Sequence, residues 1–193
     1  PIQVVIVPIY KGEEQLDSIS QVAKELKREL QLLGISVKFD DRDTHKPGWK
    51  FNEYEQKGVP LRIAIGPRDL EKRTVELARR DTLTKETVSK DDIVNRVQDL
   101  LVEMQRALFD KAKNFRDTHI TEVDTYDEFK DILENKTGFV SAFWDGTQET
   151  EERIKTETKA TIRCIPLNAK EEEGVCVYSG KPAQMRVLFA KAY

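Results

Sequence analysis

The chain has 193 residues, 38% of them hydrophobic and 35% charged, a balance that predicts a folded protein with a heavily charged surface and excludes a disordered chain. Its net charge of -3 at pH 7 excludes a strongly basic nucleic-acid binder, so any contact with RNA must come from a local group of basic side chains. Only two cysteines are present, which is too few for a disulfide framework or a four-cysteine zinc site and favours a reducing cytoplasm.

The first residues follow the pattern of a strand, a helix and a second strand. Residues 3–9 form an unbroken run rich in β-branched side chains, which is typical of a buried strand and far shorter than the ~20 apolar residues of a membrane helix. Apolar residues then recur at helical spacing over 19–33, Gly34 stands where a helix C-cap is expected, and residues 35–39 alternate as a strand does. This order predicts a parallel βαβ unit.

A densely charged segment comes next. Residues 40–49 are predicted to form a polar loop with Pro-Gly turn chemistry, and a helix is expected from Lys50 toward Gly58. Residues 61–65 have the pattern of another strand. A hairpin is predicted after it, with its polar turn at 81–84.

A long helix closes the first domain, because an apolar stripe runs from Ile93 toward Phe115. The polar stretch around its end predicts two domains, 1–116 and 117–193. The second domain is expected to be a small α+β domain with a capping box at 125–128 and a charged helix near 150–158. Its strands are predicted at four places: 139–144, 161–165, 175–178 and 186–190.

No motif of an independent enzyme is present. The sequence has no phosphate-binding glycine-rich loop and no His-Glu-x-x-His pattern, and its only histidines are His45 and His119. Nothing pairs two carboxylates in an apolar pocket, so the many acidic residues are interpreted as solvated surface. Catalysis by this chain alone is therefore not expected.

Four short stretches interleave acidic, basic and aromatic residues: DDR at 40–42, KPGWKF at 46–51, EQKGVPLRI at 55–63 and GPRDLE at 66–71. Such a mixture suits single-stranded RNA, whose bases stack on aromatic or guanidinium planes and are hydrogen-bonded at their edges. It also fits a simpler alternative, in which the aromatic side chains fill the core and the charges pair on the surface.

The order of these stretches resembles the anticodon-binding domain of class II aminoacyl-tRNA synthetases and, in detail, prolyl-tRNA synthetases of the archaeal and eukaryotic type. Residues 123–130, 161–166 and 189–193 resemble the extra C-terminal domain of that type. The resemblance implies an α/β fold, with a mixed-sheet anticodon-binding domain surrounded by helices and then a small α+β domain. It also implies proline tRNA as the partner, with the middle and last anticodon bases, both guanine, read by the first domain.

Four base-reading residues are implied by the resemblance: Glu55, Arg62, Arg68 and Lys85. An arginine can donate two parallel hydrogen bonds to guanine O6 and N7, and a glutamate can accept from the N1-H and N2-H edge. The family has lysine where this chain has Arg68, and a one-residue length difference affects the match of Lys85.

Many relatives in this family hold zinc with four cysteines in the C-terminal domain. The positions that match them here carry Asp145, Thr150, Cys176 and Ser179. Because one thiolate does not make a closed tetrahedral site, we expect no zinc. Cys164 lies outside the ligand pattern and is predicted to be a small buried residue.

The resemblance further implies a catalytic domain upstream, which the start at Pro1 also suggests. That domain would use ATP and magnesium in a cytoplasmic, homodimeric proline-tRNA ligase, with neither a membrane nor DNA as partner. Tyr193 would then either help to support the active site or be an ordinary strand end beside Phe189. Two alternatives stay open: another class II synthetase, such as the threonyl, histidyl or glycyl type, and a free-standing module that binds proteins.

Overall fold

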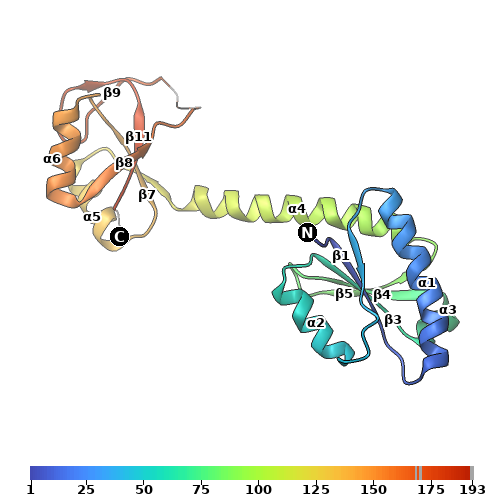
Figure 1. Ribbon diagram of the computed structural model, residues 1–193. Helices are drawn as coiled ribbons and strands as arrows, with labels where there is room; N and C mark the ends of the chain where they lie inside the picture. The colour runs from blue at the N-terminus through green and yellow to red at the C-terminus, as the bar shows by residue number, and fades with distance from the viewer. Residues whose placement is uncertain (168, 170, 192–193) are drawn as a thin grey trace. The chain divides into compact units, whose positions relative to one another are not determined.

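The computed structural model describes residues 1–167, 169 and 171–191, so the prediction for Tyr193 lies outside the described residues. The chain divides into two compact units, Pro1–Phe109 and Asp110–Tyr193. The helix α4 (Ile93–Thr118) runs through this division, and the boundary expected after residue 116 falls inside it (Figure 1). Each unit is considered by itself.

A five-stranded sheet forms the centre of the first unit. Its spatial order is β2 (Val37–Phe39), β1 (Val4–Pro8), β3 (Leu61–Ile65), β4 (Thr74–Arg79) and β5 (Lys85–Ser89). Both neighbours of β1 run parallel to it, whereas β3, β4 and β5 are joined antiparallel. The predicted βαβ unit and the predicted hairpin are both confirmed.

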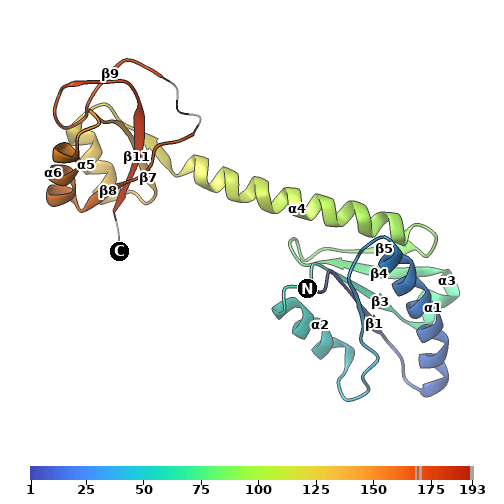
Figure 2. The same ribbon diagram turned by 45° about the horizontal axis from the view of Figure 1, so that its top comes forward.

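The two faces of this sheet are covered differently, as Figure 2 shows. One face packs against α1 (Glu13–Leu32) and the first half of α4 in a large apolar cluster. The other face carries α2 (Pro47–Gln56), whose Tyr54 packs with Val5 and Val7 of β1. The short helix α3 (Pro67–Lys72) follows β3 and was not expected from the sequence, since six residues are too few to show a helical period.

Strand alternation decides which side chains face α2 and which face α1. In β3, Leu61, Ile63 and Ile65 point into the large cluster, so Arg62 points to the opposite face. The register aligns Arg62 with Ala78 of β4, and Ala78 with Lys85 of β5. One row of side chains across three strands is thus left beside α2, with a small residue in its middle.

The second unit contains a four-stranded sheet and two helices. Its strand order is β6 (Ile120–Glu122), β7 (Phe139–Phe143), β11 (Arg186–Lys191) and β8 (Ala160–Cys164). The helices α5 (Tyr126–Asn135) and α6 (Gln148–Thr158) pack on it around Phe129 and Phe189, and β9 (Gly174–Val175) pairs with β10 (Pro182–Ala183) as a small ribbon. Thr125 and Glu128 form the predicted capping box.

Three expectations for this unit need correction. Strand β6 lies in the polar stretch where the domain boundary was expected and no strand was predicted. Its three residues form a strand because they pair in parallel with β7. The strand expected at 175–178 ends at Val175, where a turn begins. The prediction of a buried Cys164 is wrong: the side chain is exposed at the end of β8.

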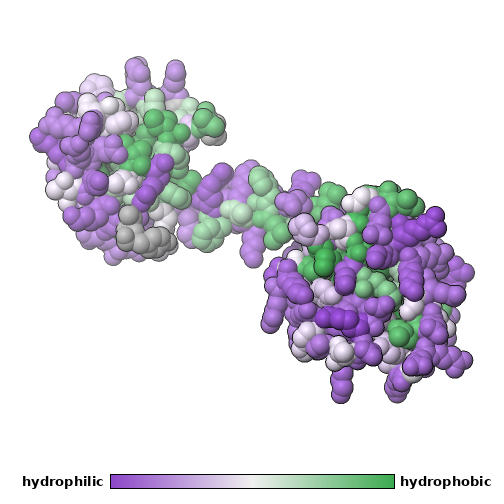
Figure 3. Space-filling view, viewed as in Figure 1, coloured by the Kyte–Doolittle hydropathy of each residue, from purple (hydrophilic) through white to green (hydrophobic). Residues whose placement is uncertain are grey.

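Hydrophilic side chains cover most of the visible surface of each unit, with smaller hydrophobic patches between them (Figure 3). This agrees with the high content of charged residues. Within the described residues, no helix is both long enough and apolar enough to span a bilayer.

Candidate nucleic-acid interface

A closed polar cluster fixes α2 to the sheet. The fully buried carboxylate of Asp40 accepts hydrogen bonds from Arg42 at 2.8 and 2.7 Å and from the Tyr54 hydroxyl at 3.1 Å. Lys50, which is 1% exposed, donates to the backbone oxygens of Asp40 and Arg42 at 3.0 and 2.5 Å. Every charge in the cluster has a partner, so α2 is held in one orientation.

This cluster changes the acidity of two of its members. Burial raises the pKa of Asp40, but hydrogen bonds from Arg42 and the Lys50 charge outweigh it and lower the pKa to about 2. Burial and the Asp40 charge raise the pKa of Tyr54 to about 12. At neutral pH the carboxylate is therefore ionised and the phenol keeps its proton.

The end of α2 places Glu55 beside β3. Gly58 adopts φ +77, a left-handed conformation that favours glycine, and turns the chain from the helix into the strand. The backbone oxygen of Glu55 accepts from Gly58 N at 3.1 Å and from Arg80 Nε at 2.8 Å. Its carboxylate makes no hydrogen bond or ion pair with any residue that the structure describes.

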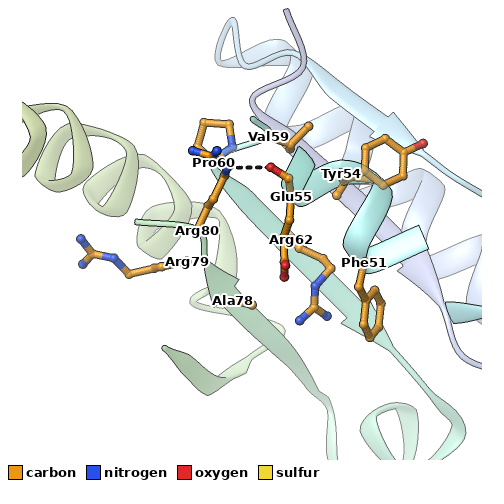
Figure 4. A pocket seen from close by; sticks show the side chains of 10 residues that line it. Phe51, Tyr54, Glu55, Val59, Pro60, Arg62, Ala78, Arg79 and Arg80 are labelled. Carbon is orange, nitrogen blue, oxygen red and sulfur yellow. Dashed lines mark hydrogen bonds between the residues drawn. The ribbon is translucent and has the colours of Figure 1, made fainter. Parts of the chain in front are cut away.

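A small hollow lies between the end of α2 and strands β3 and β4. Figure 4 shows the side chains of Glu55 and Arg62 directed into it, above Ala78. The Arg62 guanidinium lies 3.6 Å from the ring centroid of Phe51, an arrangement in which the ring and the cation attract each other. The hollow thus combines an acid, a planar cation and a small residue at its floor.

Arg62 is only partly satisfied in this position. The side chain is 7% exposed, and its Nη1 donates to Glu76 at 3.2 Å. Its Nε is buried and has no hydrogen-bond partner among the described residues. A buried donor without an acceptor costs about 1–3 kcal/mol, and such groups in native proteins call for an explanation such as a ligand.

Lys85, on the edge strand β5, is paired with the same Glu76 carboxylate as Arg62. Its Nζ lies 3.4 Å from the Glu76 oxygen that also accepts from Arg62. Two strand spacings of about 4.8 Å separate the Arg62 and Lys85 backbones. One carboxylate therefore links two cations that face the same open surface.

Arg68 lies elsewhere on the unit. It is exposed in the first turn of α3, beyond the end of β3, whereas Arg62 is near the beginning of that strand. At about 3.3 Å per strand residue the two are well over 10 Å apart. The structure brings Glu55, Arg62 and Lys85 onto one surface and leaves Arg68 at the opposite end of β3.

The aromatic residues of the charged segment divide between core and surface. Tyr54 is 4% exposed and belongs to the core, and Phe51 is half-buried against Arg62. Trp49 is 46% exposed and stacks on His45 at 3.7 Å. The sequence analysis did not single out Glu76. Glu76 is two residues before Ala78 in β4, so both side chains lie on the same face of the sheet as Arg62, and this spacing was the one signal that could have identified it.

A second closed polar cluster lies in the second unit, at the positions that match the zinc cysteines. One oxygen of Asp145 accepts from Thr147 N and Oγ1 at 3.1 and 2.8 Å, and the other accepts from Thr150 at 2.9 Å and Ser179 at 2.7 Å. Cys176 is buried nearby against Phe143. Three of the four matching positions are therefore connected directly by hydrogen bonds.

The carboxylate at the centre of this cluster, Asp145, is ionised at neutral pH. Partial burial raises the pKa of Asp145, but the hydrogen bonds from Ser179, Thr147 and Thr150 outweigh it and lower the pKa to about 2. Among the residues described, no group of three or more His, Cys, Asp or Glu side chains is placed to hold a metal ion.

Comparison with known families gives two matches that follow the division into units. Residues 3–100 match the anticodon binding domain, and residues 126–193 match the C-terminal domain of prolyl-tRNA synthetase. The chain belongs to the anticodon-binding domain family. Together the two matches correspond to the C-terminal region of prolyl-tRNA synthetases, which confirms the fold class expected from the sequence.

Curated relatives agree with this assignment. Proline-tRNA ligases of Christiangramia forsetii, Flavobacterium johnsoniae and Porphyromonas gingivalis are 64%, 62% and 58% identical to the chain over 193 residues. Each alignment covers 100% of this chain but 39% of the relative. The chain thus spans about two-fifths of the length of the curated relatives it matches.

Proposed function

We propose that the first unit reads the anticodon of proline tRNA through the open face of its sheet. The observation that carries this proposal is the hollow in which the unpaired carboxylate of Glu55 faces Arg62. A guanine offers the complementary groups: N1-H and N2-H donors for a carboxylate, and O6 and N7 acceptors for a guanidinium. A strand with two guanines would therefore be distinguished from other sequences.

Each candidate reader has a distinct part in this proposal. Glu55 accepts from the Watson-Crick edge of one guanine, and Arg62 donates to an acceptor edge while a base stacks near Phe51. Lys85 adds a flexible cation at the edge of the same surface. Arg68 contacts a different nucleotide of the strand, because it lies at the other end of β3.

The whole protein is proposed to be a proline-tRNA ligase that attaches proline to its tRNA with ATP and magnesium in a separate catalytic domain. This rests on the names of the relatives and on the matched C-terminal domain. We propose the archaeal and eukaryotic type, although these relatives are bacterial, because that type carries the extra domain. A cytoplasmic homodimer is proposed on the same resemblance.

The second unit is proposed to hold no zinc. Asp145, Thr150 and Ser179 offer hard oxygen ligands, which suit zinc poorly compared with thiolates, and they already satisfy one another. The hydrogen bonds would then fix the strand and helix ends that a metal fixes in other members of the family.

The test is binding of the 193-residue chain to an anticodon stem-loop with the proline anticodon at low salt. Loops with either guanine replaced are the competitors, and Arg62→Lys is the variant, because it keeps the charge but loses the bidentate geometry. We expect the wild type to prefer the double-guanine loop by at least about fivefold per guanine, from about 1–3 kcal/mol per bidentate pair. Arg62→Lys is expected to lose most of the preference for one guanine.

Lys24→Arg is the matched control, since Lys24 is an exposed cation on α1, which packs against the opposite face of the sheet. It should leave both affinity and preference unchanged. Equal binding of the wild type to every loop would refute anticodon readout, and the absence of binding would favour a module that contacts proteins.

A further inference from the structure

Two adjacent arginines at the end of β4 have opposite environments. Arg79 donates to Asp81 from Nε and Nη2 at 3.1 and 2.8 Å and to Glu103 from Nη1 at 3.0 Å. Its side chain is 18% exposed, on the side of the sheet that packs against α4. All three of its nitrogens are paired, so Arg79 is a structural residue.

Arg80 points to the other side, toward the rim of the hollow (Figure 4). Its Nε donates to the Glu55 carbonyl at 2.8 Å, and its backbone N donates to the Pro60 carbonyl at 3.0 Å. The two terminal nitrogens have no hydrogen bond or ion pair with any residue that the structure describes. Arg80 is thus an exposed cation anchored at one end and unpaired at the other.

We propose that Arg80 binds a phosphate of the RNA strand whose base is held by Glu55 at the mouth of the hollow. The proposal rests on the proposed function, because it places the phosphate beside a base held by Glu55. The Nε hydrogen bond fixes the plane of the guanidinium, and the unused edge presents parallel N-H donors in the geometry that suits a phosphate.

The charges around the hollow explain why such a contact is needed. Glu55 has an unpaired carboxylate there, and Glu76 neutralises part of the charge of Arg62 and Lys85. An approaching phosphate is therefore repelled by acids unless an unpaired cation stands at the rim. Arg80 is that cation, and it also holds the backbone of Glu55 in place.

A phosphate contact and a base contact leave different signatures. A phosphate contact strengthens binding of every sequence equally and contributes to the salt dependence, whereas a base contact contributes mainly to discrimination. Arg80 is accordingly expected to supply affinity without sequence preference.

The experiment measures binding of the 193-residue chain to the proline anticodon stem-loop and to guanine-substituted loops over a range of salt concentrations. Arg80→Gln should weaken binding to all loops by about the same factor, near tenfold at low salt. The slope of log affinity against log salt should fall by roughly 0.7, the value for one single-strand phosphate. Arg80→Lys should retain the wild-type slope because it retains the charge.

Arg79→Gln is the matched control. It removes the same charge from the adjacent position, which also borders the hollow but whose side chain is directed toward Glu103 of α4, and it should lower thermal stability while leaving the salt slope unchanged. Thermal unfolding of all variants shows whether a loss of binding reflects loss of structure.

Two results would overturn the phosphate contact. One is an Arg80→Gln variant with the affinity and slope of the wild type. The other is a loss confined to the double-guanine loop with an unchanged slope, which would mean that Arg80 acts only by positioning Glu55. Equal binding of the wild type to all loops would instead overturn the proposed anticodon readout alone, because the change in slope would still report the phosphate contact.

Discussion

The Asp145 cluster of the second unit and the hollow of the first unit differ in how completely their polar side chains are hydrogen-bonded. In the second unit, the two oxygens of Asp145 accept four hydrogen bonds and the cluster is complete. In the first unit, the hollow contains a buried Arg62 Nε with no acceptor and a Glu55 carboxylate with no donor among the described residues. A completed cluster stabilises the fold, whereas an incomplete one keeps its hydrogen bonds available for a ligand.

The first unit contains both kinds of cluster within one helix. Lys50, in the first turns of α2, is buried and paired with Asp40 and Arg42 of the loop before the helix, whereas the Glu55 carboxylate near the other end of α2 is unpaired among the described residues. The closed cluster therefore fixes the helix that presents the open one. Variants that disturb the two kinds of cluster should differ in whether they change stability or binding.

Lys50→Met should have the largest effect. It leaves two backbone oxygens without their ammonium donor and removes the positive charge 3.7 Å from the Asp40 carboxylate, so we expect the first unit to lose about 3 kcal/mol of unfolding free energy. Urea denaturation followed by Trp49 fluorescence in a Trp144→Phe background reports this unit alone, since the chain has only two tryptophans. Lys57→Met, at the end of the same helix, is the control. Lys57 is 56% exposed, so loss of its ion pair should lower the unfolding free energy by less than about 0.5 kcal/mol. Equal losses in both variants would contradict a special role of the closed cluster.

Asp145→Ala should destabilise the second unit by about 2 kcal/mol, because it leaves the Thr150 and Ser179 hydroxyls without their acceptor. Trp144 fluorescence in a Trp49→Phe background measures the change. Asp127→Ala, an exposed residue in the first turn of α5, is the control. RNA binding by the first unit should be unaffected, and a loss of binding would show that the two clusters are not independent.

Acid should weaken both closed clusters in the same range of pH. The pKa of Asp40 is about 2 when folded against 3.8 otherwise, so its stabilisation is present above pH 4 and is lost as the pH falls toward 2. The difference corresponds to about 2 kcal/mol at most. Asp145 also has a folded pKa of about 2. Denaturation at pH 5, 4 and 3 should show the loss, and Asp145→Asn should flatten it in the second unit only. A stability that is constant over this range would refute the charged state of both clusters.

Glu76→Gln should alter binding more than stability. Removing the charge frees Arg62 and Lys85 from a shared carboxylate, so we expect a few-fold tighter binding to all loops and a smaller preference for guanine. Fluorescence anisotropy with matched loops measures both quantities. Glu86→Gln is the control, since Glu86 pairs with Arg96 of α4 and not with the readers. An unchanged preference for guanine would show that Glu76 does not hold Arg62 and Lys85 in position.

Removal of metal should have the smallest effect. Treatment with a chelator is expected to leave the thermal midpoint of the second unit unchanged, because the Asp145 cluster is closed by hydrogen bonds. Elemental analysis is the direct measurement. About one zinc atom per chain would contradict the proposal.

Local patterns were sufficient for most elements of the first unit. The run that became β1, the amphipathic α1 and the strand β3 each carry a complete period within their own residues. Short elements were missed because their pairing is set from outside: α3 has six residues, and β6 has three residues that pair with β7. Cys164 was misplaced because β8 becomes exposed at its end, which no property of cysteine reveals.

The sequence by itself indicated the family, because the order of charged and aromatic residues carries the resemblance, and it gave Glu55 and Arg62 as candidate base-reading residues. Only the tertiary structure decided that Lys85 joins them through Glu76, that Arg68 lies at the other end of β3, and that Arg80 stands unpaired at the rim. The physical reason is strand register. A shift of the whole β4–β5 hairpin by one residue against β3 would move Glu76, Ala78 and Lys85 to the other face, and no local pattern fixes that register.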